Sequence, residues 1–132
     1  MQAVDRDALF KTLNEGVLSE RLASFHINLE KNRPLIERYG GLGRIVQLMH
    51  GKHVVIAAAG PSLEEKLHLL KAACDRPDAV VIAVDMALRP LVKSGILPDF
   101  VMSCETTPVD FFGGITTDAM HLLAFSCMRN ST

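Results

Sequence analysis

The sequence predicts an α/β protein with a Rossmann-like parallel sheet of about four strands, preceded by a helical N-terminal segment. Short apolar runs typical of buried strands recur at His53–Ala58, Ala79–Val84 and Phe100–Cys104. Between the first two runs, Leu63, Leu67 and Leu70 lie at helical spacing. A strand, a helix and a second strand in this order form a βαβ unit, in which the two strands are parallel.

The first 50 residues are expected to form a helical lead-in. Leucine and valine recur at helical spacing near its beginning, where Asp5 or Asp7 can act as an N-cap. A second helix is expected over Glu20–Lys31, with Pro34 interrupting the pattern. A short helix over Arg44–His50 would then lead into the first strand. Nothing in this part indicates an active site.

The first strand ends in Gly60-Pro61-Ser62-Leu63, which we expect to form a phosphate-binding turn. Gly60 lets a ligand approach the backbone, and Pro61 stiffens the chain. Ser62 and Glu65 have the spacing of a capping box, and the helix start beyond it favours an anion. An ordinary capped turn between a strand and a helix explains the same residues. The glycine fingerprints of dinucleotide-binding folds and of P-loops are both absent from the sequence.

Two successive strands are followed by an acidic residue. Asp85 comes directly after Ala79–Val84, and Glu105 directly after Phe100–Cys104. The carboxyl ends of parallel strands meet at one edge of a sheet, where α/β proteins bind ligands. Asp85 is therefore expected to hold a ribose hydroxyl or, through water, a metal ion. Alternatively, it caps the helix that begins at Met86.

The remainder of the chain indicates a sheet that is cut short. Residues 106–117 form a looser segment that contains Pro108, and His121–Cys127 is expected to be a fourth strand. The chain stops where a loop should lead to the next helix, so we interpret it as a truncated piece of a longer protein. Residues 1–50 would be the helical lead-in, and residues 51–132 the N-terminal part of a nucleotide-binding domain.

Composition excludes several classes of protein. The net charge of −1 indicates neither nucleic acid nor an anionic membrane as a partner, and no apolar run is long enough to span a bilayer. Cys74, Cys104 and Cys127 form an odd set without a C-x-x-C motif, which favours a reducing, cytoplasmic location and buried thiols rather than disulfides or zinc ligands.

Four segments together resemble a known domain family: Gly60–Leu63, Val84–Leu91, Gly95–Asp99 and Val101–Glu105. They are similar to the motility-associated factor (Maf) flagellin glycosyltransferases, whose domain family also includes the archaeal 6-hydroxymethyl-7,8-dihydropterin pyrophosphokinase (MptE). The resemblance implies transfer of a nonulosonic acid, such as pseudaminic or legionaminic acid, from a CMP donor to Ser or Thr hydroxyls of flagellin. This nucleotide-sugar donor and the flagellin acceptor would be its partners.

The resemblance also implies roles for individual residues. Gly60, Pro61, Ser62 and Leu63 would contact the phosphate of the donor, Asp85 would lie near the ribose or base, and Asp99 and Glu105 would line the rim of the cleft. Glu105 stands where the relatives usually have aspartate. No residue can be assigned as the catalytic base, and the isolated fragment is expected to be inactive.

Two other functions use the same residues. A Mg²⁺-dependent 6-hydroxymethyl-7,8-dihydropterin pyrophosphokinase would bind ATP at the same turn, with Asp85 and Glu105 holding the metal. A non-catalytic Rossmann-like module would fold without binding a nucleotide.

Overall fold

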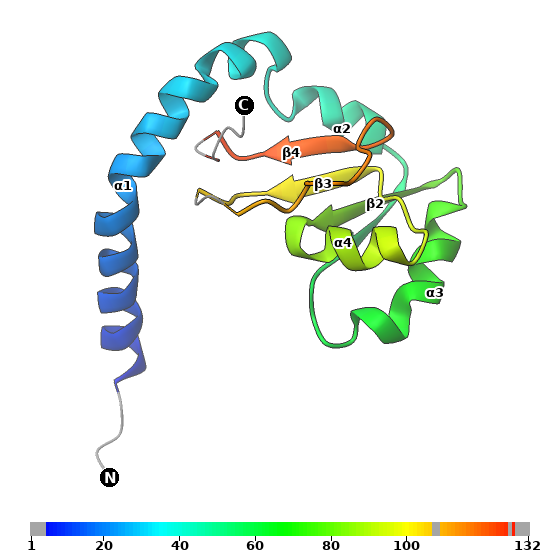
Figure 1. Ribbon diagram of the computed structural model, residues 1–132, viewed down its shortest axis with the longest axis horizontal. Helices are drawn as coiled ribbons and strands as arrows, with labels where there is room; N and C mark the ends of the chain where they lie inside the picture. Colours follow the sequence, from blue (N-terminus) through cyan, green and yellow to red (C-terminus); the bar gives the residue numbers. More distant parts are fainter. Residues whose placement is uncertain (1–4, 107–108, 127, 129–132) are drawn as a thin grey trace.

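The computed structural model describes residues 5–106, 109–126 and 128 and confirms an α/β fold with a four-stranded parallel sheet (Figure 1). The strands are β1 (His53–Ala57), β2 (Ala79–Val84), β3 (Phe100–Ser103) and β4 (His121–Ala124). They are arranged in the order β1-β2-β3-β4, so each strand pairs with the next one in the sequence. Each connection therefore leads to the next strand in the same direction along the sheet. Because connections between parallel strands are almost always right-handed, the connecting segments are expected on one face of the sheet.

Helices α3 (Leu63–Cys74) and α4 (Asp85–Lys93) connect β1 to β2 and β2 to β3. Both cover the same face of the sheet, where they form the larger of two apolar clusters. The strands contribute Ala57, Val81 and Ala83 to this cluster, and the helices contribute leucines that include Leu70 and Leu91. The small strand residues let the two helices approach the sheet closely, which fixes the position of the strand ends next to the helix starts.

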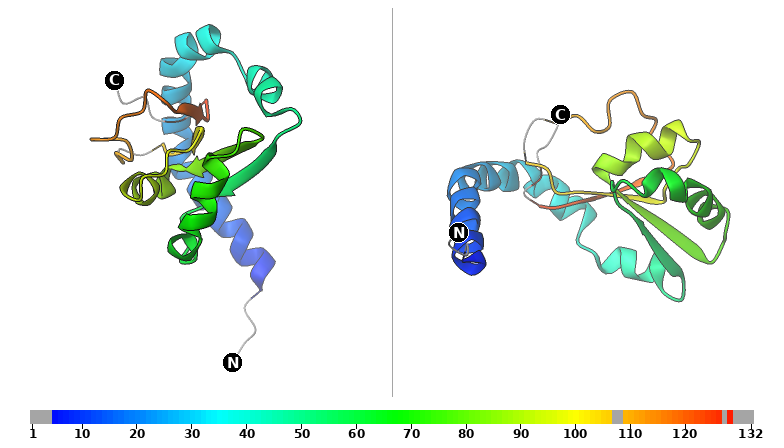
Figure 2. Two further views of the ribbon diagram at one scale, coloured as in Figure 1. Left: turned by 90° about the vertical axis from the view of Figure 1, so that its right-hand side faces the viewer. Right: turned by 90° about the horizontal axis from the view of Figure 1, so that it is seen from below.

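Helix α2 (Gly43–Met49) lies on the opposite face, as Figure 2 shows. Its Ile45 and Met49 pack against the second cluster of buried residues, which consists of Val80, Ile82, Phe100 and Leu123. This short helix covers only part of the face. At the β1 edge, the side chains of Val54 and Ile56 are 44% and 70% exposed.

Helix α1 (Arg6–Tyr39) is one continuous helix of 34 residues, so the expected interruption near Pro34 is wrong. Asp5 is its N-cap and accepts hydrogen bonds from the N–H groups of Asp7 and Ala8. The guanidinium of Arg33, the residue before the proline, donates to both carboxylate oxygens of Glu30, which lies one turn earlier. This local ion pair supports the turn in which proline removes a backbone donor.

The second half of α1 is also fixed by a tertiary contact. The buried Asn32 side chain donates through Nδ2 to the carbonyl oxygens of Ser126 and Met128, at 3.0 and 2.6 Å. The amide thereby ties α1 to the segment that follows β4. The first half of the helix extends away from the sheet, and its Leu13 and Leu22 are half exposed (Figure 1).

Two expectations about the cysteines and the last strand need correction. Cys104 is exposed rather than buried, because it follows the last residue of β3 and continues the alternation in which Met102 is exposed and Ser103 is buried. Cys74 is half-buried, and burial raises the pKa of its thiol, which donates to the carbonyl of Leu97. β4 ends at Ala124, and Cys127 lies outside the described residues. Across the described ranges, no helix has both the length and the apolar character needed to cross a membrane.

Candidate functional site

The turn between β1 and α3 exposes its backbone to solvent. Gly60, Pro61 and Ser62 are exposed, whereas the Leu63 side chain is 8% exposed and packs in the core below them. The Leu63 N–H donates to the Gly60 carbonyl at 3.0 Å, which closes the turn. Leu63 therefore anchors the start of α3, and the three residues before it form the accessible surface.

The space around Gly60 is open. Its φ angle does not fall in the left-handed region, and a Cβ atom added to it would meet nothing within 4 Å. Neither the backbone conformation nor the packing of the described chain therefore requires glycine at this position. A ligand that approaches the backbone closely would require it.

Ser62 does not form the expected capping box. Its φ of −77° and ψ of −3° are helical, and its side chain makes no capping hydrogen bond. A side-chain cap generally needs an extended backbone at the N-cap, so the helical backbone of Ser62 explains the missing bond. The first N–H groups of a helix have no partner within the helix. In α3 the Leu63 N–H donates to the Gly60 carbonyl, and the Ser62 side chain caps none of the N–H groups that follow it.

Asp85 is held in place at the carboxyl end of β2. It is the first residue of α4, and its Oδ1 accepts from the N–H of Met86 at 2.7 Å. Its Oδ2 accepts from the Ser103 hydroxyl at 2.6 Å. Val84, not Asp85, is the N-cap of α4, so the carboxylate lies in the first turn, where the helix dipole favours it.

Ser103 is a residue of this site that the sequence reasoning missed. It is the last residue of β3 and is only 2% exposed, so its hydroxyl is a buried donor aimed at Asp85. The available signal was a small polar residue near the end of an apolar strand, two positions before Glu105. Through this bond, the end of β3 determines the orientation of the carboxylate on β2 and α4.

Replacing Ser103 by alanine is expected to destabilise the fold by about 1.5–3 kcal/mol, the usual range for a hydrogen bond to a charged group. The Asp85 carboxylate would lose its fixed orientation. Chemical denaturation of the variant measures the change, with the exposed Ser19→Ala as the matched control. Equal stability of the two variants would contradict this role of Ser103.

Glu105 follows β3 at the same edge of the sheet. Its carboxylate turns back toward its own chain, and Oε1 accepts from the Thr106 N–H at 2.9 Å. The neighbouring Thr106 hydroxyl is buried and has no hydrogen-bond partner in the structure. Buried hydroxyls usually have a partner, so this edge contains one polar group whose bonding within the described chain is incomplete.

Asp99 is not brought together with these residues. It precedes β3 and therefore lies at the amino end of that strand, away from the edge that carries the β1–α3 turn. Its carboxylate accepts from the Val81 N–H at 2.8 Å, and its own N–H donates to the Val81 carbonyl at 3.0 Å. Asp99 thus extends the pairing between β2 and β3 and does not line the rim.

Asp99→Ala is expected to lower the free energy of unfolding by about 1–3 kcal/mol, because the N–H of the fully buried Val81 would lose its acceptor. Asp99→Asn keeps an acceptor oxygen at the same place and is expected to lose much less. Thermal melts of both variants distinguish the cases. Equal losses would mean that the charge, rather than the accepted bond, is what matters.

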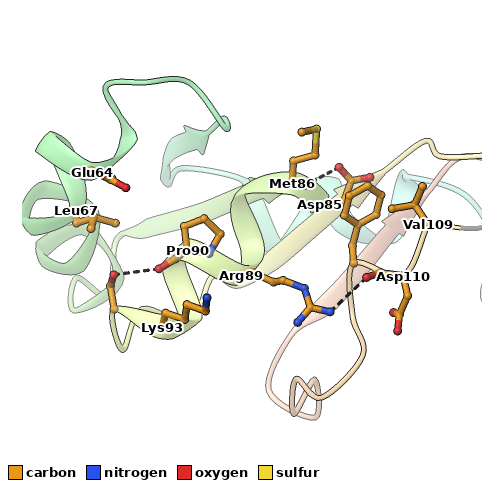
Figure 3. Close-up of a pocket in the computed structure, with 11 residues that line it drawn as sticks. Glu64, Leu67, Asp85, Met86, Arg89, Pro90, Lys93, Val109 and Asp110 are labelled. Atoms are coloured by element: carbon orange, nitrogen blue, oxygen red, sulfur yellow. Dashed lines mark hydrogen bonds between the residues drawn. The ribbon is translucent and has the colours of Figure 1, made fainter.

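A groove of about 800 Å³ runs over the exposed side of α4, next to Asp85 (Figure 3). One wall comes from the start of α3 and the other from the segment around residue 110. The lining residues are Glu64, Leu67, Asp85, Met86, Arg89, Pro90, Lys93, Ser94, Val109, Asp110 and Phe111. Asp85 belongs both to this groove and to the carboxyl edge of the sheet.

Asp85 and Glu105, the two acids expected to hold a metal ion, follow neighbouring strands at the carboxyl edge of the sheet. In the part of the chain that the structure describes, no three His, Cys, Asp or Glu side chains are grouped so that they could hold a metal ion. Both Asp85 oxygens accept hydrogen bonds from protein donors, and Glu105 bonds to its own backbone neighbour.

Comparison with known protein families identifies the family of this chain. The family model described as 6-hydroxymethylpterin diphosphokinase MptE-like matches residues 27–131, which is most of the chain and includes the whole sheet. No curated protein and no solved structure matches the chain.

Proposed function

Because this chain belongs to the 6-hydroxymethylpterin diphosphokinase MptE-like family, we propose that it is the nucleotide-binding part of a transferase. Its donor would be a nonulosonic acid linked to CMP, and its acceptor a Ser or Thr hydroxyl of flagellin. The observation that carries the proposal is the open β1–α3 turn. Gly60 is required by neither conformation nor packing there, and the Ser62 hydroxyl is not used as a cap.

In the proposed chemistry, the β1–α3 turn would stabilise the negative charge of the leaving phosphate. In glycosyl transfer, the oxygen of the Ser or Thr hydroxyl bonds to the anomeric carbon of the sugar and its proton is lost to solvent. The bond from that carbon to the phosphate oxygen breaks, and CMP leaves with the bonding electrons. Negative charge then grows on the phosphate, and backbone N–H groups at the start of α3 would stabilise it. Asp85, oriented by Ser103, would accept a hydrogen bond from a ribose hydroxyl. The Ser62 hydroxyl would donate to the phosphate.

Isothermal titration with CMP tests the proposal. We expect binding by the full chain, weakened about two- to tenfold in Ser62→Ala, as for the loss of one hydrogen bond. Ser19→Ala, which removes an exposed hydroxyl on α1, is expected to bind CMP as the native chain does. Absence of CMP binding would contradict the proposal. Unchanged CMP binding in Ser62→Ala would show that the Ser62 hydroxyl does not bind the phosphate.

The acidic first turn of α3 provides a second prediction. Glu64 and Glu65 are favourable to the helix dipole, but their charge opposes an anion at the same end. Glu65→Gln is therefore expected to tighten CMP binding by about two- to fivefold at low salt, which corresponds to the usual energy of one charge in the first turn of a helix. The exposed Glu20→Gln on α1 is the control. Weaker binding in Glu65→Gln would place the phosphate elsewhere.

A second candidate is diphosphoryl transfer from ATP to a pterin alcohol, which the description of the family favours. The same turn would receive the ATP phosphates, and Mg²⁺ would arrive bound to them as part of the substrate. Titrations with CMP and with ATP, each with and without Mg²⁺, separate the two candidates. CMP binding without metal supports glycosyl transfer, whereas binding of ATP only with Mg²⁺ supports diphosphoryl transfer.

A further inference from the structure

We propose that the groove over α4 holds the sugar of the donor, and that Arg89 and Lys93 bind the carboxylate of that sugar. This inference rests on the proposed function, because it extends the same site from the nucleotide to the transferred group. The groove reaches Asp85 and the first turn of α3, the elements assigned above to the nucleotide (Figure 3). A donor whose phosphate lies at the turn would therefore direct its sugar into the groove.

Arg89 and Lys93 supply the positive charge of the groove. They are four residues apart on the nine-residue α4, so both project from the same side of the helix. Arg89 donates through Nη2 to the backbone carbonyl of Asp110 at 3.3 Å. Neither cation forms an ion pair with any of the described residues. A planar guanidinium with free donors is suited to a carboxylate.

Two of the three acids that line the groove, Asp85 and Asp110, accept hydrogen bonds from other groups. The Asp85 carboxylate accepts from Ser103 and Met86. The Asp110 carboxylate accepts from the backbone N–H groups of Phe112 and Gly113. In Figure 3 the Arg89 guanidinium points to the backbone of Asp110, while the carboxylate of Asp110 points away from it. The groove therefore has positive groups that are not neutralised by contact with its own acids.

The remaining lining suits the rest of a nine-carbon sugar acid. Met86 and Val109 are 64% and 51% exposed, and together with Phe111 they offer apolar surface to N-acyl groups. Glu64, on the α3 side, can accept hydrogen bonds from sugar hydroxyls. The lining also includes three acids, Glu64, Asp85 and Asp110, so the carboxylate of the sugar would lie at Arg89 and Lys93, where the groove offers positive charge.

Titration with CMP and with CMP-N-acetylneuraminic acid, a nine-carbon acidic nucleotide sugar, tests this inference. The native chain is expected to bind the nucleotide sugar about tenfold more tightly than CMP, the gain of a charge-assisted pair. In Arg89→Ala/Lys93→Ala, that advantage, taken as the ratio of the two affinities in the same variant, should fall below about twofold. The control Lys66→Ala/Lys71→Ala removes two exposed cations of α3 outside the groove and should keep the advantage.

The outcomes separate this inference from the one on which it rests. If CMP binds and the advantage of the nucleotide sugar persists in the Arg89/Lys93 variant, the groove assignment is overturned and the nucleotide site stands. The same holds if the native chain shows no such advantage. If CMP does not bind to the native chain at all, the proposed function fails, and this inference fails with it. Circular dichroism melts of each variant verify that it is folded.

Discussion

Replacing Gly60 by valine is expected to weaken CMP binding about tenfold or more while leaving the melting temperature unchanged or slightly raised. The branched side chain would occupy the space through which a phosphate reaches the backbone. The fold should tolerate it, because a Cβ at this position meets nothing within 4 Å and the φ angle is not left-handed. Titration with CMP and a thermal melt measure the two effects separately.

Gly41→Val is the matched control for this prediction. Gly41 also has a φ outside the left-handed region and open space around a Cβ, but it lies between α1 and α2, far from the turn in the sequence. It should affect neither CMP binding nor stability. Full CMP binding by Gly60→Val would show that the turn is not the phosphate site, whatever the family of the chain.

Leu91→Ala is expected to lower the free energy of unfolding by about 2–5 kcal/mol, the range for a leucine truncated in a core. Leu91 is fully buried in the cluster between α4 and the sheet, and removing its isobutyl group leaves a cavity there. Because α4 carries Asp85 and Arg89, its displacement would also weaken ligand binding. Urea denaturation of the native and variant chains measures the loss.

Leu97→Ala provides the comparison for the core prediction. Leu97 is close to Leu91 in the sequence but is 52% exposed, so its truncation is expected to cost less than about 1 kcal/mol. Similar losses in the two variants would contradict the packing of α4 on the sheet described above.

The carboxyl edge of the sheet was predictable from the sequence, because its elements are encoded by local patterns. The run Ala79–Val84 became β2 with the expected bounds, and the leucine spacing predicted α3. Asp85 follows directly from the end of that strand. These features depend on residues that are adjacent or one helical turn apart, so no knowledge of distant contacts was needed.

Features that depend on contacts between distant residues were not predictable in this way. Ser103 donates to Asp85 across 18 positions of the chain, and Asp99 accepts from Val81 across the same separation. The register that pairs Ile82 with Phe100 decides both contacts. If the register is not known, the sequence does not show whether a carboxylate near a strand end lines the candidate site or accepts a hydrogen bond from the neighbouring strand.

The amino-acid sequence by itself thus determined a parallel α/β sheet, a turn at Gly60 and the acid at the end of β2, since short-range spacing and residue size dictate them. Only the tertiary structure decided that α1 continues through Pro34, that Asp99 joins β2 to β3, and that Arg89 and Lys93 line a groove beside Asp85. The physical reason is that a side chain's role depends on the partners that folding brings to it, and these partners come from distant parts of the chain.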